Sequence, residues 1–131
     1  MIVLDASAIV ELLLDTAAGR RVAILIEDPA LSLHVPHLLD VEVASALRRL
    51  ARERHIEADE AEAALDDLRA LDLQRHSHEP LLDRAWGLRD NASAYDAMYI
   101  ALAEALDATL LTCDARLHRV KGVRARMELV S

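Results

Sequence analysis

Short apolar runs alternate with longer helical patterns along the whole chain, and this alternation restricts the possible folds more than any other feature. Runs typical of strands occupy residues 2–5, 32–35, 71–76, 109–113 and 127–130. The segments between them are long enough to cross over between parallel strands as helices. The sequence therefore predicts an α/β fold whose central, mainly parallel sheet is covered on both faces.

The helical segments are expected at residues 7–15, 18–27, 36–54, 58–71, 79–90 and 94–107, with a short helical turn at 115–119. Pro36 suits a first helical position, so the third helix is expected to begin there. The chain has 131 residues without repeats or a linker, and 53% of them are hydrophobic, which excludes disorder. We expect one domain spanning residues 1–131.

The composition also limits where such a protein works. No apolar run approaches the roughly 20 residues needed to span a bilayer. Asp5 and Glu11 interrupt the first apolar segment, so no signal peptide is expected. The lone Cys113 cannot form an internal disulfide, which is consistent with a reducing compartment. We expect a cytoplasmic protein that does not enter the membrane.

Four acidic side chains occupy positions where a carboxylate without a partner would be costly to bury. Asp5 and Asp114 end two strands, at the sheet edge where α/β folds bind ligands. Glu42 and Asp96 interrupt apolar stripes of predicted helices. Each has a structural alternative: Asp5 and Asp114 as helix caps, Asp96 in a capping box with Ser93, and Glu42 paired with an arginine.

Together the four acids predict a cation site. Two carboxylates about 6 Å apart repel by roughly 3 kcal/mol at an effective dielectric constant of about 20. Several such pairs would consume much of a typical folding free energy of about 5–15 kcal/mol. The cluster must therefore hold protons or a cation, and ligands that are all oxygen favour Mg²⁺ or Mn²⁺. A hard divalent ion in an open carboxylate site is typical of phosphoryl-transfer chemistry.

Other cofactor signatures are weak. The histidines, including the pairs His34/His37 and His76/His78, lack zinc-ligand spacing and are expected to be surface or loop residues. Only three glycines are present, so no glycine-rich phosphate loop exists. The net charge of -8 argues against nucleic-acid binding by bulk attraction, although arginines cluster between residues 48 and 54. That cluster is either a phosphate contact or a solvated helix face.

Four motifs in order, LDASAIVELL, PHLLDVEVASALRRL, SAYDAMYIALAEAL and LLTCDARL, resemble those of PIN-domain ribonucleases. More closely, they resemble the VapC toxins of VapBC toxin–antitoxin pairs, and the resemblance covers the chain from Met1 to about Val130. It implies a PIN-like three-layer α/β/α sandwich. It also implies that Asp5, Glu42, Asp96 and Asp114 are the catalytic acids, with Asp5, Asp96 and Asp114 holding Mg²⁺ or Mn²⁺.

The same resemblance assigns further residues. Ser7 and Thr112 match the small hydroxyl positions that accompany the acids, which implies a supporting role. Because the net charge is acidic, Arg48, Arg49 and Arg52 (the arginine row) are the expected RNA contacts. The row forms a single short stretch of the helix that carries Glu42.

The implied activity is that of an endoribonuclease toxin. It would cut tRNA or another structured RNA by in-line displacement, leaving a 5′-phosphate and a 3′-hydroxyl, and so inhibit translation. The resemblance also implies a homodimer and a VapB-type antitoxin that covers the active site. Two other classes are alternatives: a receiver-type phosphoacceptor domain and a non-catalytic interaction module that keeps its metal site. The first would need a second acid beside Asp5 and a lysine ending a late strand, whereas Lys121 is expected in a loop.

Overall fold

The computed structural model describes residues 1–131 and is built around a five-stranded sheet in which all neighbouring strands are parallel. The strands are β1 (Ile2–Leu4), β2 (Leu33–Pro36), β3 (Leu73–His76), β4 (Thr109–Thr112) and β5 (Met127–Leu129). Their order in the sheet is β3-β2-β1-β4-β5, so β1 lies at the centre between β2 and β4. The predicted mainly parallel sheet is confirmed.

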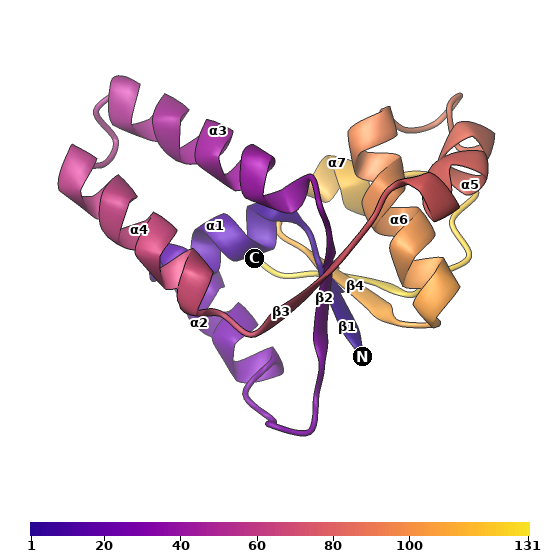
Figure 1. Ribbon diagram of the computed structural model, residues 1–131, viewed down its shortest axis with the longest axis horizontal. Coiled ribbons are helices and arrows are strands. Elements are labelled where there is room, and N and C mark those ends of the chain that lie inside the picture. The colour runs from indigo at the N-terminus through magenta and orange to yellow at the C-terminus, as the bar shows by residue number, and fades with distance from the viewer.

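The helices form a layer on each face of this sheet, as Figure 1 shows. The helices are α1 (Ala6–Leu13), α2 (Ala17–Leu25), α3 (Leu39–Arg52), α4 (Ala58–Ala70), α5 (Leu82–Gly87), α6 (Ala94–Leu106) and α7 (Ala115–His118). A 3₁₀ turn, Glu79–Leu81, precedes α5. The first four helices lie on one side and α5, α6 and α7 on the other, which confirms the three-layer sandwich. No helix is both long and apolar enough to cross a membrane.

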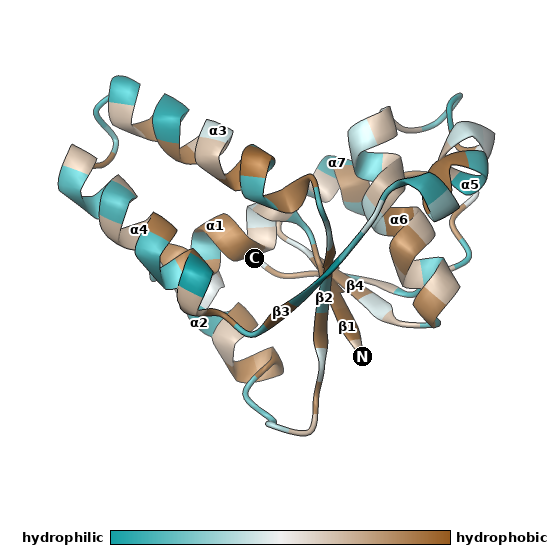
Figure 2. Cartoon of the chain, in the orientation of Figure 1, coloured by the Kyte–Doolittle hydropathy of each residue, from teal (hydrophilic) through white to brown (hydrophobic).

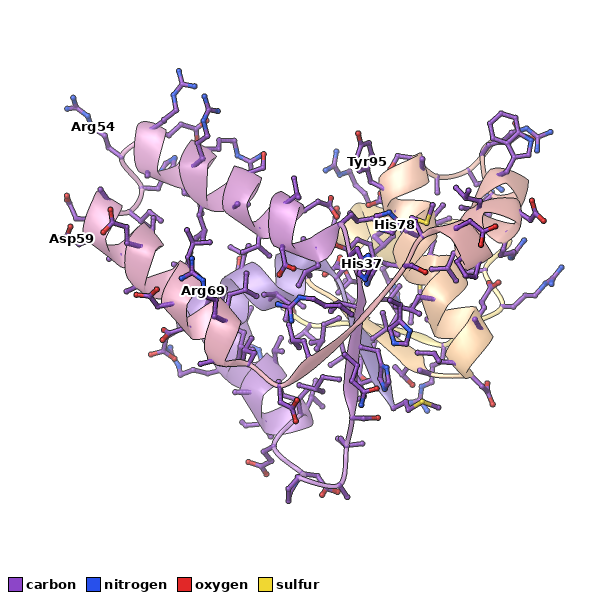
Figure 3. All side chains as sticks on the ribbon, viewed as in Figure 1. His37, Arg54, Asp59, Arg69, His78 and Tyr95 are labelled. Carbon is purple, nitrogen blue, oxygen red and sulfur yellow. The ribbon has the colours of Figure 1, made fainter.

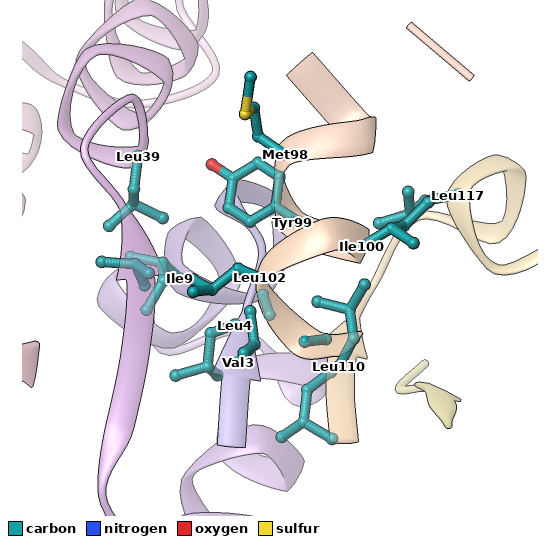
Figure 4. Packing of buried hydrophobic residues seen from close by; sticks show 14 of the residues in the cluster. Val3, Leu4, Ile9, Leu39, Met98, Tyr99, Ile100, Leu102, Leu110 and Leu117 are labelled. Atoms are coloured by element: carbon teal, nitrogen blue, oxygen red, sulfur yellow. The ribbon is translucent and has the colours of Figure 1, made fainter. Parts of the chain in front are cut away.

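The core forms where the central strands meet α6. Val3, Leu4, Leu110 and Leu111 are at most 1% exposed, and Figure 4 shows Val3, Leu4 and Leu110 packed beside α6. In α6, every residue from Ala97 to Ala103 is buried. By contrast, Figure 2 shows hydrophilic turns at the outer ends of α3 and α4, which extend beyond the sheet. The central strands are therefore fixed on both faces, and the loops at their carboxyl ends start from a rigid base.

The expected start of the third helix at Pro36 is wrong. Pro36 is the last residue of β2, opposite His76 of β3, and α3 begins at Leu39. The missing amide proton of a proline normally weakens a sheet. Here the register between β1 and β2 ends at Val3 and His34, so β1 requires no hydrogen bond from position 36.

The expectation that the histidines are surface or loop residues is also wrong for two of them. His34 lies in β2 and is only 4% exposed, and its Nδ1 is 2.8 Å from Nε2 of His76 in β3. The other ring nitrogen of His34 is 2.8 Å from the Ser32 hydroxyl. Because the two imidazoles form a hydrogen bond with each other across neighbouring strands, their polar atoms can be buried inside the sheet at little cost.

Candidate active site

The four acids predicted from the sequence gather around one cleft at the carboxyl edge of the sheet. Asp5 follows β1 directly and Asp114 comes two residues after the neighbouring β4, where the chain connections diverge to opposite sides. Glu42 stands in the first turn of α3 and Asp96 in the first turn of α6. The cleft has a volume of about 620 Å³, and Glu42, Asp96 and Asp114 line it.

Asp5 is held in a tight cradle below this cleft. It is 5% exposed, and its Oδ1 accepts hydrogen bonds from the Ser7 hydroxyl at 2.7 Å and from the Ala8 amide at 2.9 Å. Its Oδ2 accepts from the Thr112 hydroxyl at 2.5 Å. The bond from Ala8 also caps α1, so Asp5 acts as the helix cap that the sequence left as an alternative.

Ser7 and Thr112 connect Asp5 to the loop that carries Asp114. The Ser7 hydroxyl accepts from the Cys113 amide at 2.9 Å, and the Thr112 hydroxyl accepts from the Asp114 amide at 2.9 Å. Since each hydroxyl donates its proton to Asp5, both are fully committed as donors. The two hydroxyls therefore fix the end of β1 against the end of β4 and set the relative positions of the two acids.

Glu42 has a partner that the sequence did not predict. Its Oε1 accepts a hydrogen bond of 2.6 Å from the hydroxyl of Tyr99 in α6, so the structural alternative, pairing with an arginine, is wrong. The apolar stripe around Glu42 differs from the core face of α3: Ala46 and Leu50 line the cleft, while Val43 and Leu47 are buried. Glu42 thus stands on the wall of the cleft.

Asp96 and Asp114 are less enclosed. Ser93 caps α6 by accepting from the Asp96 amide at 3.1 Å, and Ser93 is the only residue whose hydrogen bonding acts to lower the pKa of Asp96. Asp114 caps α7 through the Arg116 amide at 2.8 Å and lies 3.6 Å from the exposed guanidinium of Arg116. The capping alternative is therefore real for Asp114, whereas only one of the two bonds of the Ser93–Asp96 capping box forms, and neither contact blocks access to the acid from the cleft.

The acids disfavour one another's charge. Burial raises the pKa of Asp5 against the bonds from Thr112, Ser7 and Ala8, and the charge of Asp114 adds to the rise. Burial raises the pKa of Glu42, opposed by Tyr99 and reinforced by Asp96 and Asp5.

The same causes act on Asp96. Its pKa is raised by burial first and by Asp114 second, while Arg116 acts to lower it. None of Asp5, Glu42 and Asp96 is ion-paired with a basic side chain. The site is therefore a set of linked carboxylates with no internal countercharge except Arg116, a composition that suits a cation.

The donor set fits a hard divalent ion in its chemistry, because every acidic ligand is an oxygen and no cysteine or histidine pair competes. No three acidic, imidazole or thiol side chains are arranged so that they could hold one ion together. Mg²⁺ commonly keeps several waters and takes only one or two protein carboxylates. The residues therefore fit an ion bound by few direct ligands, with the other acids reached through water.

The arginine row lies on the exposed side of α3 next to the cleft. Arg49 lines the cleft itself, and Arg48, Arg49 and Arg52 with Glu53 surround an adjoining hollow of about 290 Å³. All three guanidinium groups are exposed and none is ion-paired with a carboxylate. Asp40, by contrast, forms a two-bond pair with Arg75 at 2.7 and 2.9 Å and takes no part in the cleft.

Two residues of the site were missed by sequence reasoning. Tyr99 lies three positions after Asp96, which places both on one helix face, and a buried tyrosine usually needs a hydrogen-bond partner. Arg116 comes two residues after Asp114 and lines the cleft. The spacing of Tyr99 was a usable signal, whereas nothing local pointed to its partner, Glu42.

Comparison with known proteins identifies the family of this chain. A family model for the PIN domain matches residues 2–123. VapC ribonuclease Mb0985 from Mycobacterium bovis is 46% identical over 117 residues, covering 89% of this chain and 88% of that protein. Ribonucleases VapC1 and VapC12 from Mycobacterium tuberculosis are 43% and 40% identical over 98% and 100% of this chain, and 96% and 100% of theirs.

Solved structures show the same fold at low sequence identity. Mycobacterium tuberculosis VapC20, described as a toxin that cleaves the sarcin-ricin loop, has a TM-score of 0.69 at 16% identity, covering 96% of this chain and 99% of its own. VapBC2 from Rickettsia felis, solved with a promoter DNA fragment, has a TM-score of 0.72 at 14% identity and covers both chains fully. The chain therefore belongs to the PIN-domain family and, within it, groups with the VapC ribonucleases.

Proposed function

We propose that residues 1–131 form one PIN domain that acts as a divalent-metal-dependent endoribonuclease, the toxin of a type II toxin–antitoxin pair. The observation that carries the proposal is that Glu42, Asp96 and Asp114, from distant segments, line one cleft directly above Asp5. No basic side chain is ion-paired with Asp5, Glu42 or Asp96. The relatives named ribonucleases match this chain over most of its length, which supports the assignment.

Each acid has a distinct place in the proposed reaction. Asp5, Asp96 and Asp114 would hold Mg²⁺ or Mn²⁺, some of them directly and the others through water, and the bound ion would polarise the scissile phosphate and lower the pKa of a water. Glu42, on the opposite wall, orients the attacking water in line with the leaving 3′ oxygen. Water attacks phosphorus, the bond to that oxygen breaks, and the products carry a 5′-phosphate and a 3′-hydroxyl. Ser7 and Thr112 support the site by fixing Asp5.

The substrate is a structured RNA in this proposal. One structural neighbour is described as a toxin that cleaves the sarcin-ricin loop. Only 2% of the residues are aromatic, so stacking on exposed bases contributes little. The arginine row beside the cleft then places the RNA backbone, and target choice follows from RNA shape.

The proposed partners follow from the neighbours as well. VapBC2 and a further structural neighbour, FitAB, were each solved bound to a DNA fragment. We propose that a VapB-type antitoxin covers the cleft and places a basic side chain among the acids, because Asp5, Glu42 and Asp96 have no basic side chain paired with them. The active species is a cytoplasmic homodimer.

The proposal is tested with purified protein and total cellular RNA. Cleavage is expected with Mg²⁺ or Mn²⁺, to stop in chelator, and to be lost in Asp96→Asn, which keeps the size of the side chain. Sequencing of the new ends is expected to show 5′-phosphates. Cleavage that persists in chelator or in the variant would contradict the proposal. A protein that binds Mn²⁺ but never cuts RNA would instead be a non-catalytic metal-binding module.

A further inference from the structure

We propose that Tyr99 is the positioning residue for Glu42: its phenol holds Oε1 of the glutamate and leaves Oε2 available to the cleft. The inference rests on the proposed function and deepens it. It adds to the site a fifth side chain, which acts through Glu42 and touches neither RNA nor ion.

The contact itself is unusually well defined. Tyr99 is 1% exposed, and its hydroxyl donates a hydrogen bond of 2.6 Å to Oε1 of Glu42. No other hydrogen bond and no ion pair reaches the Glu42 carboxylate. Hydrogen bonds to a charged acceptor are shorter and stronger than neutral ones. The phenol is therefore the one polar group that selects the rotamer of Glu42.

The bond joins two helices that otherwise pack on different neighbours. Helix α3 packs on α1 and α4, while α6 packs on α5 and the central strands. In Figure 4 the Tyr99 ring extends from α6, and its oxygen lies on the side that faces Leu39 at the start of α3. Tyr99 and Glu42 are 57 residues apart in the chain. The hydrogen bond therefore ties one wall of the cleft to the other.

Tyr99 also relates Glu42 to Asp96. The two α6 residues are three positions apart, so they lie on one face of the helix. Any shift of α6 moves Asp96 and the phenol together, and Glu42 follows through the hydrogen bond. Burial, followed by Glu42 itself, raises the pKa of Tyr99 far above its ordinary value, which keeps the phenol protonated as a donor.

Removing the phenol would free Glu42 to leave its position. Burial, and after it the charges of Asp96 and Asp5, acts against the ionised Glu42, so we expect an unrestrained carboxylate to turn toward solvent. Loss of a partner that orients a site carboxylate typically costs about 10–100-fold in metal affinity or activity. We expect the loss in kcat and in Mn²⁺ affinity, because the phenol does not touch the RNA path along α3.

The test compares Tyr99→Phe with Tyr95→Phe. Tyr95 is the only other tyrosine, is 64% exposed and points outward from the start of α6 in Figure 3. Mn²⁺ binding is measured by EPR titration without RNA, and kcat and KM with an RNA substrate. Tyr99→Phe is expected to lose about 10–100-fold in both kcat and Mn²⁺ affinity with KM unchanged, whereas Tyr95→Phe behaves as wild type.

A double-mutant cycle with Glu42→Gln separates positioning from general support. If Tyr99 acts through Glu42, adding Tyr99→Phe to Glu42→Gln changes kcat by less than about twofold. Effects that multiply independently would overturn the inference. So would a Tyr99→Phe protein that fails to fold while Glu42→Gln folds, since the tyrosine would then serve the core.

The failures of the two proposals are distinguishable. If the wild type neither binds Mn²⁺ nor cuts RNA, the proposed function is wrong. If the wild type does both and Tyr99→Phe matches it while Glu42→Gln is impaired, only the role of Tyr99 is wrong.

Discussion

The aspartates at this cleft differ in how many structural hydrogen bonds their carboxylates accept. Asp5 accepts three hydrogen bonds and caps α1, whereas the Asp96 carboxylate accepts none from the protein outside its own capping turn. An asparagine has only one side-chain acceptor oxygen, so Asp5→Asn removes bonds that hold β1 against β4. Loss of activity in Asp5→Asn would therefore combine loss of the site with loss of structure, and Asp96 is the cleaner position for a test.

At the residue scale we expect Asp96→Asn to be at least as stable as the wild type without metal. Burial, and after it the charge of Asp114, raises the pKa of Asp96, so its ionised form is disfavoured in the folded state. The wild type therefore gains stability as pH falls through that raised pKa. The advantage of the variant is largest at neutral pH and closes on acidification. Urea unfolding in chelator measures it; a clearly less stable variant would make Asp96 a structural residue.

At the element scale, one side of α3 lines the cleft and its exposed side carries the arginine row. We expect Arg48→Ala or Arg52→Ala to weaken RNA binding and to reduce the salt slope of log K by roughly 0.7 for each phosphate of a single-stranded RNA that is no longer neutralised. Arg69→Ala is the matched control, because Arg69 is equally exposed on neighbouring α4 but paired with Asp66 at 2.7 Å. Fluorescence anisotropy at several salt concentrations measures the slopes. Equal slopes for all three variants would assign the arginine row to solvent or to the antitoxin.

The pairing of α1 with α2 depends on a single glycine. A Cβ at Gly19 would lie 1.9 Å from the backbone oxygen of Glu11. We expect Gly19→Ala to lower the free energy of unfolding by about 1–3 kcal/mol, although alanine favours helices by about 1 kcal/mol. At Gly87 the nearest atom is 3.7 Å away, so Gly87→Ala is expected to be neutral or stabilising. Urea unfolding of both variants checks this, and equal effects would contradict the close approach.

At the scale of the whole molecule, one ion pair ties the second helical layer to the chain before β5. Arg84 of α5 contacts Glu104 of α6 at 2.6 Å and donates to the Gly122 carbonyl at 2.7 Å. Glu104 also accepts from the Arg124 amide at 2.7 Å. Because these bonds join three segments, they hold the layer that carries Asp96 in place against the sheet.

We expect Glu104→Gln to lower the free energy of unfolding by about 1–3 kcal/mol. Burial acts to raise the pKa of Glu104, but the bonds from Arg84 and Arg124 outweigh it and lower the pKa from 4.5. This stabilisation is complete above the pKa of the unfolded chain and is lost as pH falls through the lower folded pKa. The difference between wild type and variant should therefore close in acid. If the difference in unfolding free energy stayed constant down to low pH, the packing of the Glu104 side chain, and not its charge, would account for the stabilisation.

The sequence by itself determined the layers of this protein and the list of acids. Hydrophobic periodicity is local, so it was enough to predict five strands, the helices between them and the placement of Asp5 and Asp114 at strand ends. It could not predict that Pro36 would end β2, because that depends on where the register with β1 stops.

The tertiary structure decided which side chains meet. The Tyr99–Glu42 bond and the His34–His76 pair join residues 57 and 42 positions apart, and Thr112 reaches Asp5 across 107. No local pattern encodes such pairings, since they depend on sheet order, register and the packing of α6 against the strands. Periodicity fixes which face of an element is buried, but only the assembled core fixes which atoms on that face come within bonding distance.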